Sequence, residues 1–211
     1  MIRTSLVALA LAPALLAACT NPGGKRFEFR EVENIDPSAG NVWFEALSTL
    51  CGRGAYAGEL VSTDEVDADF RNAAITVGPA ICNEDEIGLP LAVGEDRSRT
   101  WVVTRLENGL RLKHDHRHKD GTPDALTWYG GMAFGDGRVD WQQFPVDQET
   151  RALFIREGIE VSNQNTWALE IEPFESLAYQ MWRPNRNFRI EFDLTQEVAA
   201  PPPPWGLEPV E

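Results

Sequence analysis

The sequence has 211 residues, a length that suits one domain with terminal tails better than two domains. Acidic residues outnumber basic ones, 33 against 19, and the formal net charge at pH 7 is −14. Nucleic acids and anionic lipid headgroups are also negative, so this charge balance disfavours both as direct partners and we expect no nucleic-acid partner.

Residues 1–18 have the features of a secretory signal peptide. Arg3 precedes an apolar run that is too short to anchor stably across a bilayer, and small residues follow it. The segment Leu16-Ala-Ala-Cys19 resembles the lipobox of bacterial lipoproteins. This resemblance implies cleavage before Cys19 and a lipid anchor on Cys19. It also implies the outer membrane, on the side facing the periplasm, because Thr20 rather than aspartate follows the cysteine. An ordinary secretory signal, with Cys19 incidental, is the alternative.

The two remaining cysteines, Cys51 and Cys82, form an even pair once Cys19 is assigned to lipid. Secreted proteins meet an oxidising environment, in which disulfides form and persist. We therefore predict a disulfide between Cys51 and Cys82, with two separate buried thiols as the alternative.

The mature chain is expected to divide into a tether at residues 19–40, one β-barrel domain at residues 41–196 and a tail at residues 197–211. Glycine and proline turn signals occur throughout the tether. Four consecutive prolines in the tail predict a stiff polyproline arm.

Within the domain, the pattern of apolar residues is first helical and then strand-like. The spacing of Trp43, Leu47 and Leu50 predicts a short amphipathic helix over residues 41–50. Strands with alternating or buried patterns are then predicted at residues 55–62, 70–81, 87–93, 167–172, 179–181 and 188–194. Asp147 is expected to cap a second short helix that stops at Gly158, and Gly130-Gly131 is expected to form a turn.

Residues 98–118 contain the clearest hairpin. Asn108-Gly109 separates two strand-like runs, and such a pair is a strong signal for a two-residue turn. With these residues as the turn, Trp101 faces His116, while Lys113 and Arg117 point to water. Because side chains alternate along a strand, one inward face then carries Trp101, Val103, Leu110, Leu112, His114 and His116.

The succession of about nine or ten short strands predicts an all-β antiparallel meander that closes into a barrel, because closure removes exposed strand edges. A β-sandwich is the alternative. A short helix, the glycine-rich strand from Gly54 to Gly58 and a long meander resemble the lipocalin, or calycin, and avidin barrels, by fold alone. Residues 96–101 and 113–118 are also similar to segments of secreted bacterial proteins, a similarity that implies no activity.

Three histidines suggest a metal site. Residues two apart on a strand are roughly 6.6 Å from each other, so His114 and His116 could share a metal, whereas all three histidines could not. The pattern departs from the metallo-β-lactamase motif, which requires aspartate and histidine where this chain has His118 and Lys119. The simpler interpretation is that hydrogen-bonded histidines lie at the mouth of a barrel.

The favoured hypothesis is a non-catalytic envelope protein, anchored by lipid, that binds a small apolar ligand or another envelope component without a cofactor. No catalytic residue is predicted. The alternative is a metal-dependent enzyme or metal-binding protein centred on His114 and His116. The residues predicted to line the ligand site are Trp101, Leu112, His114, His116, Trp128, Trp167 and Phe192.

Overall fold

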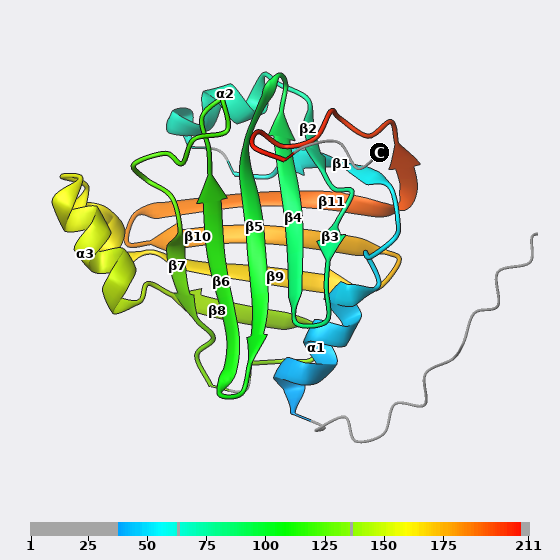
Figure 1. The fold of residues 1–211 in the computed structure, drawn as a ribbon, viewed down its shortest axis with the longest axis horizontal. Coiled ribbons are helices and arrows are strands. Elements are labelled where there is room, and N and C mark those ends of the chain that lie inside the picture. The colour runs from blue at the N-terminus through cyan, green and yellow to red at the C-terminus, as the bar shows by residue number, and fades with distance from the viewer. Residues whose placement is uncertain (1–37, 63, 136, 208–211) are drawn as a thin grey trace, which may run out of the picture. The chain divides into compact units, whose positions relative to one another are not determined.

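The computed structural model describes residues 38–62, 64–135 and 137–207 (Figure 1). The predicted signal peptide, Cys19 and nearly all of the predicted tether lie outside these residues. No helix in the described part of the chain is long and apolar enough to cross a membrane.

The described residues form a mostly β structure with three short α-helices. The helices are α1 (Ala39–Ser48), α2 (Ala68–Arg71) and α3 (Gln148–Arg156), and two 3-10 turns are η1 (Glu65–Asp67) and η2 (Glu160–Gln164). The strands are β1 (Ala55–Leu60), β2 (Ile75–Val77), β3 (Ile81–Cys82), β4 (Glu86–Val93), β5 (Asp96–Leu106), β6 (Gly109–His116), β7 (Tyr129–Met132), β8 (Trp141–Pro145), β9 (Thr166–Glu172), β10 (Ser176–Arg183) and β11 (Arg186–Val198).

Ten of these strands follow one another in the antiparallel order β7-β6-β5-β4-β2-β1-β11-β10-β9-β8, and β3 pairs with β4 beside this path. Two backbone hydrogen bonds join the two ends, from Phe134 to Gln143 and from Asp147 to Gly130, each 3.1 Å long. The sheet therefore forms a nearly closed barrel, and the predicted barrel fold is confirmed. In Figure 1 strands β4, β5 and β6 cross in front of β9, β10 and β11 rather than running alongside them.

The seam between β7 and β8 depends on two glycines. A Cβ atom on Gly131 would lie 1.8 Å from the carbonyl oxygen of Pro145, and one on Gly130 would lie 1.9 Å from that of Leu112. Only glycine allows the backbones to come this close. The prediction that Gly130-Gly131 forms a turn is therefore wrong, because the close approach of neighbouring strands demands these glycines inside β7.

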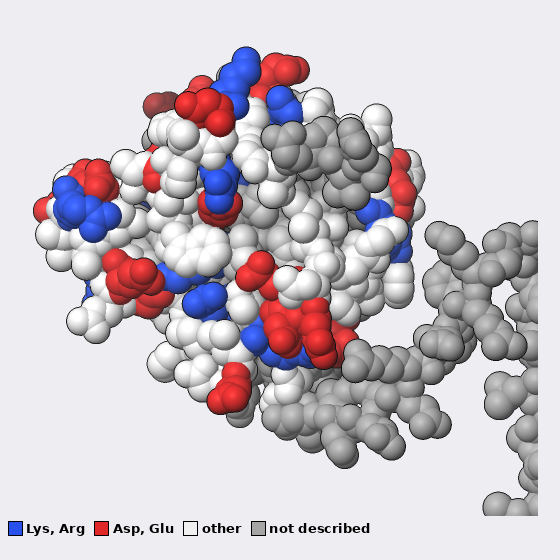
Figure 2. Space-filling view, viewed as in Figure 1, with Lys and Arg blue, Asp and Glu red and all other residues white. Residues whose placement is uncertain are grey.

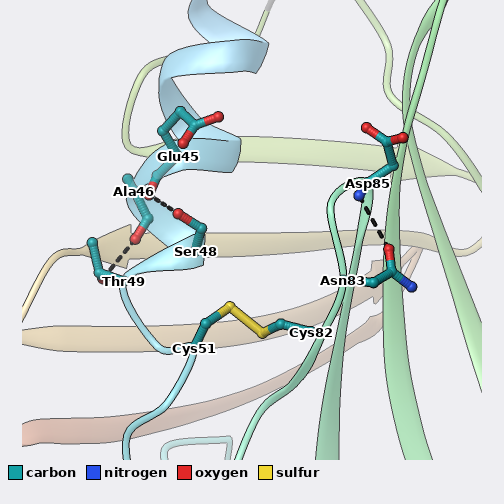
Figure 3. The surroundings of a disulfide bond; sticks show 8 residues. All are labelled: Glu45, Ala46, Ser48, Thr49, Cys51, Cys82, Asn83 and Asp85. Carbon is teal, nitrogen blue, oxygen red and sulfur yellow. Dashed lines mark hydrogen bonds between the residues drawn. A yellow bond between two sulfur atoms is a disulfide. The ribbon is translucent and has the colours of Figure 1, made fainter. Parts of the chain in front are cut away.

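Helix α1 closes one end of the barrel. Its N-cap residue, Ser38, accepts a hydrogen bond from the Asn41 backbone, and its apolar side packs inward, with Trp43 6.1 Å from the ring of Phe144. At the end of this helix the predicted disulfide between Cys51 and Cys82 is present and ties the helix to β3 (Figure 3). Acidic side chains gather beside α1 on the face shown in Figure 2, interrupted by basic ones.

The hairpin β5–β6 has the predicted faces but a different turn. The turn residues are Glu107 and Asn108, since Leu106 already pairs with Gly109, and Trp101 therefore faces His114 instead of His116. Each pairing moves by two residues, which is one full period of a strand, so every side chain stays on its predicted face. Leu112 and Trp101 are accordingly buried.

Lys113 contradicts the prediction that it points to water. It lies on the outer face of β6 as expected, yet its side chain is only 1% exposed. Its Nζ atom lies 2.8 Å from Asp147 Oδ2 and 3.1 Å from Glu149 Oε2 at the start of α3. Asp147 also caps α3 as predicted, by accepting a hydrogen bond from the Thr150 backbone. The N-terminal turn of α3 thus covers a lysine that strand alternation alone assigns to solvent.

Candidate functional site

A pocket of about 320 Å³ opens at the end of the barrel opposite α1. Helix α1 reaches the turn of the β5–β6 hairpin through a 2.7 Å ion pair between Glu45 and Arg105. The pocket instead meets the far ends of the same two strands, at Arg99 and His116. Phe70 of α2 and Phe154 of α3 also line it. The barrel therefore has one end filled by a helix and one end with an accessible cavity.

Aromatic rings make up much of the pocket wall. The ring of Trp101 stacks on that of Tyr179 with centroids 4.1 Å apart, and the ring of His114 stacks on that of Tyr129 at 4.4 Å. Trp167 lies 5.2 Å from His114 in a tilted contact. Contacts of this kind fix ring positions in a packed wall and leave a rigid, preformed surface for a ligand.

His114 is held as a neutral ring inside this wall. Burial lowers its pKa to about 3, well below the ordinary 6.5. Nδ1 donates a hydrogen bond to the carbonyl oxygen of Tyr129 at 3.1 Å, because a carbonyl oxygen can only accept. Nε2 then accepts one from the Tyr179 hydroxyl at 2.8 Å, and burial raises the pKa of Tyr179 so that this proton is retained. Both ring nitrogens of His114 are therefore engaged.

His116 lies nearer the opening and is partly exposed. Its Nε2 atom is hydrogen-bonded to Ser98 Oγ at 2.9 Å, and its Nδ1 atom is 3.9 Å from Asp124 Oδ1. Burial, followed by the neighbouring positive charge of Arg99, lowers the pKa of His116 below its ordinary value. This Ser–His–Asp set superficially resembles a nucleophilic site, but Ser98 is buried and does not line the pocket. The set therefore offers no nucleophile to a bound molecule.

Two arginines line the pocket, and both already have acidic partners. Arg186 makes a paired contact with the buried carboxylate of Asp67, with distances of 2.9 and 2.5 Å. Nη1 of Arg99 donates a hydrogen bond to Oδ2 of Asp96 at 2.5 Å. Burial acts to raise the pKa of Asp96, but hydrogen bonds from Ser98 and Arg99 outweigh it and hold that pKa below its usual range. The carboxylates therefore largely balance the two guanidinium charges. The pocket wall has polar groups, but it does not present a strong net positive charge to a ligand.

Four of the residues predicted to line a ligand site lie in this pocket: Trp101, His114, His116 and Trp167. Leu112 and Phe192 instead belong to the packed core, with exposures of 0% and 1%. Trp128 lies outside the pocket and is 39% exposed, in a loop where its φ is +59°. The alternation pattern identified the inward face correctly, but it carries no information on which inward residues border empty space.

Several pocket residues were not predicted. Tyr179, Met181 and Phe188 belong to strands whose alternation was recognised, so their inward direction was a usable signal. The pair of Asp67 and Arg186 is separated by 119 positions, and nothing in the local sequence around either residue indicates the other.

The predicted metal site has little support in this geometry. Among residues 38–62, 64–135 and 137–207, no three His, Cys, Asp or Glu side chains are grouped so that they could hold a metal ion. His114 uses both nitrogens in hydrogen bonds, and His118 lies apart from the pocket with its side chain 57% exposed. To bind His114, a metal ion would have to break the hydrogen bond of the ring to the Tyr179 hydroxyl or the one to the Tyr129 carbonyl oxygen.

Comparisons with protein-family profiles, with curated proteins and with solved structures find no match for this chain.

Proposed function

We propose that the protein is a lipid-anchored component of the bacterial cell envelope whose barrel binds a small, largely apolar molecule without changing it chemically. The observation that carries this proposal is the aromatic pocket of about 320 Å³ at the end of the barrel opposite α1. Concave, mostly preformed sites with apolar walls and a few polar groups are typical of small-molecule binding.

The chemistry of the wall supports binding over catalysis. The two histidines are neutral near pH 7, and the two arginines have carboxylate partners. A ligand with an apolar body gains from contact with Trp101, Trp167 and Phe188, whereas a charged ligand gains little from groups that are already paired. The combination of a helix at one end and a pocket at the other also supports the lipocalin-like description of the barrel.

The proposed location in the cell envelope rests on the predicted signal peptide and on the disulfide. The segment ending at Cys19 resembles a lipobox, and a bond between Cys51 and Cys82 suits an oxidising compartment. A Cys19→Ala variant should lose the acyl modification and move from the membrane fraction to the soluble periplasmic fraction, or remain unprocessed. An unchanged mass and an unchanged membrane fraction would refute the lipid anchor.

The binding proposal can be tested with native mass spectrometry of the protein extracted from its own membranes. Leu126 borders the pocket, so Leu126→Asp should place a carboxylate in the wall and abolish retention of a co-purifying small molecule. Val161→Asp is the matched control, because Val161 is apolar, exposed and outside the pocket lining. Equal retention by both variants would place the ligand elsewhere. Absence of any ligand, together with no binding of an apolar dye, would contradict the proposal.

A further inference from the structure

The segment at residues 199–207, here called the strap, belongs to the predicted stiff polyproline arm and lies against the outside of the barrel. The backbone N–H of Trp205 donates to the carbonyl oxygen of Arg97 at 3.1 Å, and Nη1 of Arg97 donates to the carbonyl oxygen of Pro203 at 2.9 Å. Gly206 packs against Gly121. A Cβ atom on Gly121 would lie 2.9 Å from the Cα atom of Gly206. In Figure 1 the strap, drawn in red, crosses over the upper part of β4 and β5.

A slot of about 390 Å³ lies between the strap and the barrel. One wall is formed by strap residues 200–204 and Leu207, and the opposite wall by residues 78–81, residues 90–92 and Arg97. Soluble proteins seldom expose a large apolar concavity, and where they do it is typical of a binding groove. Fixed proline φ angles also keep the strap stiff, so the slot exists before any ligand arrives.

The wall of the slot presents few hydrogen-bonding groups to a polar ligand, except at Arg97. Six of the fourteen described residues that line it are prolines, which have no backbone N–H to donate. Within the described part of the chain, Arg97 is the only charged residue in the lining, and it is cationic although the chain as a whole carries −14. Its guanidinium has five N–H groups, of which the contact with Pro203 uses one nitrogen. An apolar slot with a single cation at its wall fits a hydrocarbon chain that ends in an anion.

We propose that this slot binds a free long-chain fatty acid, with the alkyl chain between the strap and the barrel and the carboxylate at Arg97. Two facing walls enclose a single chain and exclude a folded protein surface. The slot lies outside the barrel and shares only Leu91 with the described lining of the barrel pocket, and it does not depend on the function proposed for that pocket.

Saturated fatty acids of increasing length test the slot on the full-length folded protein. Affinity, measured by calorimetry, should rise about fourfold for each added methylene and level off when the slot is full. A chain carrying bromine near its carboxylate should quench the fluorescence of Trp205, because the Trp205 backbone is hydrogen-bonded to that of Arg97, where the carboxylate is placed. Trp205→Phe should remove that part of the quenching while leaving the affinity unchanged. Affinity that is independent of chain length would overturn the proposal.

Three variants separate this site from others. Ile81 lines the slot and is 46% exposed, so Ile81→Asp should weaken binding at least tenfold without disturbing the core, whereas Val139→Asp, at a site 55% exposed and outside the slot, should not. Leu126→Asp, in the barrel pocket, should also bind the fatty acid normally. If Leu126→Asp abolishes binding and Ile81→Asp does not, the fatty acid occupies the barrel and the slot proposal is wrong.

The role of Arg97 can be isolated by comparing a fatty acid with the alcohol of the same length. The acid should bind the unaltered protein about fivefold more tightly, as expected for an exposed charge pair, and Arg97→Gln should remove this difference. Equal affinities of acid and alcohol for the unaltered protein would refute the claim that the ligand's carboxylate binds at Arg97. A self-association of the protein that fatty acid cannot displace would show that a second copy occupies the slot, and would overturn the proposal.

Discussion

Acidification from about pH 8 to about pH 5 should destabilise the barrel through His114, and a His114→Gln variant should lose that part of the pH dependence. The folded chain keeps this ring neutral down to a pKa of about 3, whereas the unfolded chain takes up a proton near the ordinary pKa of 6.5. The unfolded state therefore binds more protons between these values. Stability is full above pH 6.5 and is lost progressively as the pH falls towards 3.

The size of the effect follows from the proton that only the unfolded state binds at pH 5. Each pH unit below the unfolded pKa costs about 1.4 kcal/mol, so the loss through His114 between pH 8 and pH 5 is about 2 kcal/mol. This figure holds as long as the folded pKa lies well below 5. Burial of the ring between Tyr129 and Tyr179 is the physical reason that it does.

Urea denaturation of both proteins at the two pH values measures the effect directly. Glutamine can still donate to the Tyr129 carbonyl and accept from the Tyr179 hydroxyl, but it cannot titrate. His118→Gln is the matched control, because His118 is exposed and should leave the pH dependence intact. An NMR titration of the unaltered protein adds a second readout that requires no variant. A His114 resonance that titrates above pH 5, or an unchanged pH dependence in His114→Gln, would refute the reasoning.

Three further predictions concern other parts of the barrel. Lys113→Ala should lower the free energy of unfolding by about 1–3 kcal/mol by leaving two carboxylates without their buried cation, whereas exposed Lys119→Ala should be nearly neutral in urea denaturation. Replacing Cys51 and Cys82 by serine should cost about 3–4 kcal/mol, because the bond closes a loop with a sequence separation of 31, and alkylation of the unreduced, denatured protein should label neither cysteine. Zn²⁺ far above micromolar concentration should not raise the melting temperature, since the buried histidine has no free nitrogen; a rise with concentration would restore the metal hypothesis.

Local patterns of residues suffice to predict the class of fold and, for most strands, which side chains point inward. Period-two alternation is a local signal for the direction of side chains, as in β11, where Ile190, Phe192 and Leu194 are buried between exposed or partly exposed neighbours. The same local chemistry predicted the cap at Asp147 and the inward face of the hairpin. The even pair of cysteines that remains when Cys19 is assigned to a lipid anchor predicted the disulfide.

Which of these residues come into contact, and which side chains become covered, depends on long-range packing that no local pattern contains. The burial of Lys113 depends on α3, which begins at Gln148, and the slot depends on residues from four separate parts of the chain. The pairing of Asp67 with Arg186 joins opposite parts of the chain. Alternation tells which side of a strand a residue is on, but burial is a property of whatever else packs on that side. A cavity is defined by where packing stops, and no local pattern of residues records that.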